Sequence, residues 1–161
     1  AALGPMQANG SVSAGESHAW HRPLLATRAS QYDPRVRSRI ERGATMSASD
    51  YIDLLNARQH WIVRMEAALA PFDALLSPTV PLVAPPIADV APGAERDAEF
   101  FRVNALLLRN TSVVNMLDGC ALSLPCHMAG ELPVGLMVWH GALHDDAVLN
   151  VGLQIEQILQ K

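Results

Sequence analysis

The stretch CALSLPCHMAGELPVGLMVW, residues 120–139, contains two apolar segments with a turn between them. Residues 120–124 and 134–139 are short, apolar and bounded by glycine or proline, a pattern that predicts two β-strands. The residues GELP at 130–133 combine glycine and proline and predict the turn that separates the strands. This stretch therefore indicates sheet structure in the second half of the chain.

A helix is predicted on the carboxy-terminal side of these strands. Asp145 can cap a helix over residues 146–159. Apolar residues recur in it at helical spacing and would share an inner face: Val148, Val151, Ile155 and Ile158.

On the amino-terminal side, residues 73–77 (DALLS) are predicted to form another short strand. Prolines then follow at positions 78, 81, 85, 86 and 92. Proline cannot donate to a β-ladder and fixes an extended path, so this segment is predicted to be a stiff, irregular loop. Its apolar residues favour a binding loop over a solvent-exposed linker.

Helices are predicted over most of the remaining chain. They are a helix opened by the capping-box spacing Ser13–Glu16, residues 35–42 behind Asp33-Pro34, residues 47–70 behind Ser47–Asp50, and residues 98–110. Helices that alternate with short strands predict the α/β fold class. Residues 1–70 would form a mainly helical segment, and residues 71–161 a core segment of strands, loop and helices.

The composition restricts the partners of the chain. Half of its 161 residues are apolar and 17% are charged, a low share that suggests a surface normally covered by more protein. A formal net charge of -4 without a basic tract argues against nucleic-acid binding. No apolar stretch is long enough for a membrane span and no leader opens the chain, which predicts a cytoplasmic protein. Because the first residue is Ala1, we expect a start inside a longer reading frame or a trimmed chain.

Cysteines and histidines give no indication of a metal or cofactor. Cys120 and Cys126 lie six residues apart in an extended segment, about 20 Å, which is too far for a disulfide. Both are predicted to be buried free thiols in a reducing compartment. A nucleophilic Cys126 is less favoured, because His127 would project to the other face of the strand. His140 and His144 are predicted to be surface residues that flank a turn.

Two blocks of sequence together resemble the carboxy-terminal third of amidase-signature hydrolases. The first runs from Tyr51 to Ile87 and is clearest in FDALLSPTVP at 72–81 and APPI at 84–87. The second is RNTSVVN at 109–115, then ALSLPC at 121–126 and ELPVGL at 131–136. The resemblance implies a mixed sheet core flanked by helices, of which residues 1–161 are the carboxy-terminal portion. It also implies hydrolysis of a small carboxamide without a cofactor.

The catalytic parts that the resemblance implies are absent from this sequence. Family members use a serine nucleophile, a lysine that acts as base through a bridging serine, and a Gly-Gly-Ser-Ser loop. This chain has no Gly-Gly-Ser run, and its one lysine is the terminal Lys161. We therefore assign no catalytic residue within the chain and expect a Ser–Ser–Lys mechanism whose residues lie upstream.

Substrate-binding residues are predicted at two places that border the cleft in the resemblance. Thr79 follows the end of a strand, where α/β sheets place their ligands. Arg109, Asn110 and Thr111 form a turn after a helix and are rich in hydrogen-bond donors. The alternative is that Asn110 and Thr111 cap the helix and Arg109 pairs on the surface; the sequence leaves both open.

Two other functions remain as alternatives. The chain could belong to the amidase subunit of the tRNA-dependent amidotransferase, but residues 106–108 are apolar where that enzyme needs a polar substrate-binding residue. It could also be a non-catalytic interaction module that uses its apolar faces to bind a partner. A homodimer is an open alternative to a monomer. The sequence upstream of Ala1 would separate most of these hypotheses.

Overall fold

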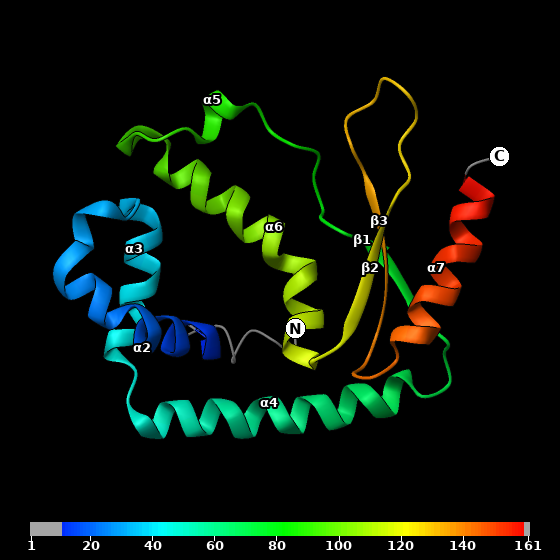
Figure 1. The fold of residues 1–161 in the computed structure, drawn as a ribbon, viewed down its shortest axis with the longest axis horizontal. Helices are drawn as coiled ribbons and strands as arrows, with labels where there is room; N and C mark the ends of the chain where they lie inside the picture. The colour runs from blue at the N-terminus through cyan, green and yellow to red at the C-terminus, as the bar shows by residue number, and fades with distance from the viewer. Residues whose placement is uncertain (1–10, 160–161) are drawn as a thin grey trace. The chain divides into compact units, whose positions relative to one another are not determined.

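The computed structural model of the chain describes residues 11–159 (Figure 1). Contacts divide the chain into two compact units, Ala1–Trp61 and Ile62–Lys161, and the division falls inside helix α4 (Ala48–Leu69). All the strands of the described residues, and both candidate sites below, belong to the second unit.

The first unit is helical over its described part. Before α4 it contains α2 (Ser11–Arg28), η1 (Ala29–Gln31), α3 (Pro34–Glu41) and η2 (Arg42–Thr45). Helix α2 packs against α3 and η2. Gly43 allows this approach, because a Cβ at that position would overlap the backbone carbonyl oxygen of Ala14. The helices predicted in this part of the sequence are confirmed.

Side-chain caps fix where α3 and α4 begin. Asp33 accepts a hydrogen bond from the backbone N–H of Arg35 at 2.8 Å, and hydrogen bonds from the Arg35 side chain and backbone lower the pKa of Asp33 to about 2. Asp50 and Ser47 cap reciprocally: the N–H of Asp50 donates to Ser47 Oγ at 3.1 Å, and the N–H of Ser47 donates to the Asp50 carboxylate at 3.0 Å. By contrast, Ser13 lies inside α2, so the capping box predicted there does not start that helix.

The second unit contains a three-stranded antiparallel sheet. Its strands are β1 (Leu75–Pro78), β2 (Cys120–Pro125) and β3 (Gly135–His140), in the spatial order β1-β3-β2. In the register, Met137 of β3 lies opposite Ser77 on one side and Ser123 on the other. Residues directly opposite one another point to the same face, so these three side chains share one face of the sheet. The three predicted strands are confirmed.

Helix α7 (Asp145–Leu159) packs against β2 and β3 and covers the other face of the sheet (Figure 1). Val148 of this helix packs with Leu124 and Val138, and all three side chains are buried. Partly buried residues complete the cluster: Ala74, Cys120, Leu122, Val151 and Ile155. Gly152 lets the helix approach β2 closely, because a Cβ there would overlap the Leu122 side chain.

Helix α6 (Asp97–Leu117) follows the short α5 (Ile87–Val90) and η3 (Ala94–Arg96), and it is longer than predicted. The prediction ended it at Asn110 with a turn over residues 109–111, but the helix continues through them. Val114 and Leu117 are buried, so packing of the added turns outweighs their weak helix propensity. The helix ends at Asp118, whose φ of 55° is left-handed.

The apolar residues of two helices are only partly covered by this chain. On α4, Ile62 and Leu69 are buried, whereas Ile52 is 56% exposed. On α7, Val148 is buried, whereas Ile158 is 67% exposed. None of the helices within residues 11–159 is both long and apolar enough to span a membrane.

Candidate functional site

The first candidate site lies where β1 ends and the proline-rich loop begins. Thr79 directly follows β1, and its backbone N–H donates to the carbonyl oxygen of Gly135 at 2.8 Å. The hydroxyls of Thr79 and Ser123 lie 2.6 Å apart, so one donates to the other. Ser123 belongs to β2 and Thr79 directly follows β1, so the two residues meet across the start of the central strand β3. We call them the hydroxyl pair.

Gly135 makes room for the hydroxyl pair. A Cβ at this position would lie 2.6 Å from Ser123 Oγ and 2.7 Å from Thr79 Oγ1. Real Cβ atoms do not approach other atoms so closely, so any side chain here would push one hydroxyl away. The absence of a side chain at Gly135 therefore leaves the space that the two hydroxyls occupy.

Asn110 ties helix α6 to the same end of the sheet. Its Nδ2 donates to the carbonyl oxygen of Pro78 at 2.8 Å, one residue before Thr79. A side-chain amide that holds a backbone carbonyl 32 positions away fixes the start of the loop relative to the helix. The structure thus brings together two of the predicted residues, Thr79 and Asn110.

The other two predicted residues lie beside Asn110 on the helix. Arg109 is exposed, and its Nε donates to Asn110 Oδ1 over a long 3.4 Å. The Thr111 hydroxyl points back along its own helix, with Leu108 O at 3.4 Å. The predicted turn at these positions is wrong, since all three residues are inside α6. Consequently neither Asn110 nor Thr111 caps the end of the helix.

Sequence reasoning missed Ser123 and Gly135. The alternation along β2 is a signal that could have identified Ser123. Leu122 and Leu124 pack toward α7, so Ser123 between them must face the other way. A small polar residue on that face, opposite a strand that starts with glycine, indicates a polar cluster.

Two buried polar atoms on the same face of the sheet have no partner. Ser77 Oγ and Trp139 Nε1 are both inaccessible, and neither forms a hydrogen bond within the described residues. The register places them together on the face that carries the hydroxyl pair, because Trp139 lies opposite Leu75 and Ser77 lies opposite Met137. A buried unpaired polar group is costly, so these two atoms lower the stability of the described structure.

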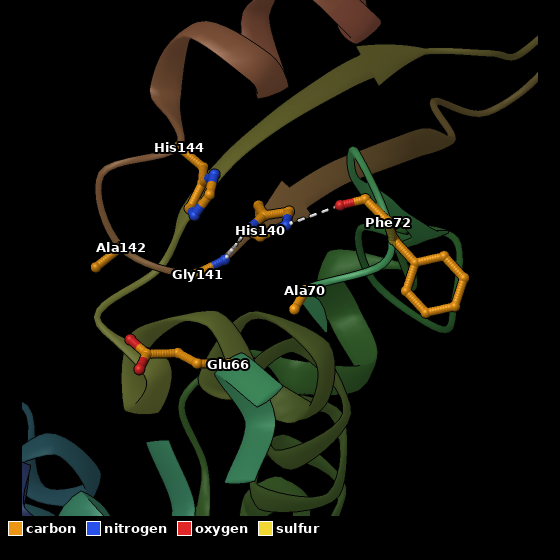
Figure 2. A pocket seen from close by; sticks show the side chains of 7 residues that line it. All are labelled: Glu66, Ala70, Phe72, His140, Gly141, Ala142 and His144. Atoms are coloured by element: carbon orange, nitrogen blue, oxygen red, sulfur yellow. Dashed lines mark hydrogen bonds between the residues drawn. The ribbon is translucent and has the colours of Figure 1, made fainter. Parts of the chain in front are cut away.

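The second candidate site is a cavity of about 420 Å³ between the end of α4 and the turn from β3 to α7 (Figure 2). His140 lies at its inner wall, and the His144 ring lies against it at a tilt of 37°, with the ring centres 3.9 Å apart. The complete lining is Glu66, Ala70, Phe72, His140, Gly141, Ala142 and His144.

Hydrogen bonds occupy both ring nitrogens of His140 (Figure 2). The backbone N–H of Gly141 donates to Nδ1 at 2.7 Å, so Nδ1 carries no proton. The proton is therefore on Nε2, which donates to the carbonyl oxygen of Phe72 at 3.1 Å. His140 joins two turns of the chain and has no free nitrogen for acid–base chemistry.

The prediction that His140 is a surface residue is wrong. Its side chain is buried because β3 runs on to this position and pairs it with Cys120. His144 is exposed, as predicted. Within the described residues, no three histidine, cysteine or acidic side chains are grouped so that they could hold a metal ion.

Both cysteines are free thiols, but only one is shielded. Cys120 is partly buried in the cluster under α7. Cys126 is exposed because β2 ends one residue before it, so the prediction that both thiols are buried is wrong for Cys126. Its Sγ lies 3.5 Å from the carbonyl oxygen of Val134. Lys161, the one lysine, lies outside the described residues.

Comparison with known proteins agrees with the sequence resemblance. The family model described as Amidase matches residues 6–149. The chain is 26% identical over 151 residues to 2-amino-5-chloromuconic acid deaminase of Comamonas testosteroni, which covers 93% of this chain. It is 30% identical over 141 residues to a glutamyl-tRNA(Gln) amidotransferase subunit of Salinispora tropica, which covers 84% of this chain.

A solved structure shares the fold as well. The crystal structure of an amidase superposes with a TM-score of 0.71 at 28% identity and covers 89% of this chain. The chain spans 32% and 27% of the two relatives and 33% of the crystallised amidase, so it covers no more than a third of any of them. The fold of this chain thus corresponds to part of a longer chain in the crystallised amidase. The family match extends over most of these 161 residues, and the chain belongs to the amidase family.

Proposed function

We propose that the chain is the carboxy-terminal part of a hydrolase that cleaves the C–N bond of a carboxamide. Membership of the amidase family supports the reaction class. The chain spans about a third of its relatives, which supports a longer parent protein with one amidase domain. The substrate would be a small amide.

The catalytic residues of this parent would lie upstream of Ala1. The chain contains no Gly-Gly-Ser run, and its one lysine is its last residue. In the Ser–Ser–Lys mechanism, the serine oxygen attacks the amide carbon while the lysine takes the serine proton through the bridging serine. The C–N bond then breaks, and the amine leaves with that proton. Water hydrolyses the acyl-serine ester and releases the carboxylic acid.

The residues of this chain would line the acyl side of the cleft. The observation that supports this assignment is the hydroxyl pair, for which Gly135 leaves space. The hydrogen bond from Asn110 on α6 to Pro78 O fixes the residue next to Thr79. Thr79, Arg109 and Asn110 would contact substrate there, beside a loop stiffened by prolines. Thr111 would join them by turning its hydroxyl away from the long 3.4 Å contact with Leu108 O.

Exposed apolar side chains support an upstream portion that packs on this chain. Leu76 of β1 is 55% exposed and Ile158 of α7 is 67% exposed. An additional polypeptide that supplies apolar cover would account for these exposed side chains.

The amidase subunit of a tRNA-dependent amidotransferase is a second candidate. The relative from Salinispora tropica, which is 30% identical, favours it. The apolar residues 106–108 on α6 count against it, because they offer no polar group to a glutamine-like substrate. Activity that requires a second subunit would distinguish this candidate from a free-standing amidase.

Truncation of the predicted cleft residues is expected to change substrate preference. In the full-length protein, Thr79→Ala and Asn110→Ala should shift kcat/KM among amides of different acyl size by roughly 3- to 30-fold, the effect of about one hydrogen bond. The melting temperature should fall by no more than about 4 °C. Both quantities are measured on purified variants with a series of amides.

Thr45→Ala is the matched control for this experiment. The Thr45 hydroxyl also donates to a backbone carbonyl, that of Arg42, but it lies in η2 of the first unit. Thr45→Ala should leave the ranking of the amide substrates unchanged. If Thr79→Ala and Asn110→Ala melt early and keep the parental ranking, these residues have a structural role and the cleft assignment is wrong.

A further inference from the structure

Arg109 carries a positive charge that no acidic side chain neutralises in the described part of the chain. Its one hydrogen bond there is the 3.4 Å contact from Nε to Asn110 Oδ1. Arg102 on the same helix differs, because its NH2 group lies 2.6 Å from Glu99 and its hydrogen bonds hold the pKa of Glu99 below the ordinary value. A guanidinium is always protonated, so the exposed Arg109 keeps its full charge.

Acidic residues are few in the segments that meet at this end of the sheet, and the one in the turn between β2 and β3, Glu131, accepts a hydrogen bond from the backbone N–H of Met128 at 2.9 Å. Neither aspartate nor glutamate occurs in residues 74–88, 100–117 or 119–130. The first of these segments carries Thr79, the second Arg109 and Asn110, and the third Ser123. The charge of Arg109 therefore stands in an environment of hydroxyl, amide and apolar groups, which favours an anionic ligand.

Short contacts connect this charge to the hydroxyl pair. Arg109 is followed by Asn110, whose Nδ2 holds Pro78 O at 2.8 Å, and the next residue is Thr79 with its hydroxyl 2.6 Å from Ser123. In the hydroxyl pair one O–H is used between the two residues, and the other remains able to donate. This end of the sheet thus offers a guanidinium and a hydroxyl donor, the groups that recognise a carboxylate.

We propose that Arg109 selects amides whose acyl portion carries a carboxylate, with the hydroxyl pair as the additional donor. This inference rests on the proposed function, because it names the substrate class of that cleft. The planar guanidinium would bind the two carboxylate oxygens with parallel N–H donors, and a lysine could supply only the charge. Arg109 is then a specificity residue and takes no part in breaking the C–N bond.

The test compares two amides of similar length with the full-length protein. Succinamic acid carries the carboxylate, and butanamide has a methyl group in its place. The acid is expected to have a kcat/KM roughly 10- to 100-fold higher, mainly through a lower KM, which is the size of a charged hydrogen-bonded contact. Arg109→Gln should bring the ratio of the two values to about 1, and Arg109→Lys should keep part of it.

Arg102→Gln is the matched control, since its guanidinium is already held by Glu99. Arg102→Gln should preserve the parental ratio of the two kcat/KM values. Hydrolysis of both amides with equal kcat/KM, or a preference that survives Arg109→Gln, would overturn the inference and leave the amidase proposal standing. A folded full-length protein that hydrolyses no carboxamide at all would overturn the proposed function, and this inference with it.

Discussion

Replacing Gly135 by alanine in the full-length protein is expected to lower kcat/KM for its amide substrate by roughly 10- to 100-fold. The added Cβ would lie 2.6 Å from Ser123 Oγ and 2.7 Å from Thr79 Oγ1, so at least one hydroxyl must move. A displaced hydroxyl that no longer bonds a charged group of the substrate costs about 1.5–3 kcal/mol, and every 1.4 kcal/mol in transition-state binding is a factor of ten in rate. Steady-state kinetics and a melting curve of the same sample measure the two effects.

Gly141→Ala is the control at the other end of β3. The nearest atom to a Cβ there is Glu66 Cγ at 3.8 Å, an ordinary contact, and the backbone N–H that bonds His140 is retained. This variant should keep parental kinetics. If Gly135→Ala keeps them too, the hydroxyl pair is not part of the substrate cleft.

Replacing His140 by alanine is expected to lower the free energy of unfolding by about 2–4 kcal/mol. The change removes the partner of the Gly141 N–H and of the Phe72 carbonyl, and it leaves space behind a side chain that is 5% exposed. Each hydrogen bond contributes about 1 kcal/mol, and the cavity adds to this cost. Urea unfolding of the full-length protein measures the difference.

His144→Ala provides the comparison within the same pair of rings. His144 lies against His140 but is exposed, so its loss should cost less than about 1 kcal/mol. If the two variants lose the same free energy of unfolding, the hydrogen bonds of His140 to Gly141 and Phe72 do not stabilise the protein.

Local patterns were sufficient to predict most of the elements. The three strands follow from short apolar runs between glycine and proline, and α3 and α4 follow from the caps at Asp33 and Ser47. The end of α6 could not be predicted this way. Asn110 and Thr111 favour a helix end by propensity, but burial of Leu117, 0% exposed, extends the helix past them. That burial depends on tertiary contacts that a local pattern does not contain.

The candidate site was predicted in part for a similar reason. Thr79 follows a strand, and Asn110 belongs to a donor-rich stretch that borders the cleft in the resemblance, but the bond from Asn110 to Pro78 O joins positions 32 residues apart. Ser123 and Gly135 acquire their roles from the β1-β3-β2 order, which brings the two outer strands together across β3. His140 was misplaced because its burial comes from the strand pairing of the last residue of β3.

We expect this chain to shape the cleft of an amidase whose nucleophile lies upstream. The most direct test is to inactivate the full-length protein with a serine-directed fluorophosphonate, digest it, and locate the label by mass spectrometry. The account predicts one labelled serine before Ala1 and no label on any serine of residues 1–161. A label on a serine within residues 1–161, accompanied by loss of amide hydrolysis, would contradict it.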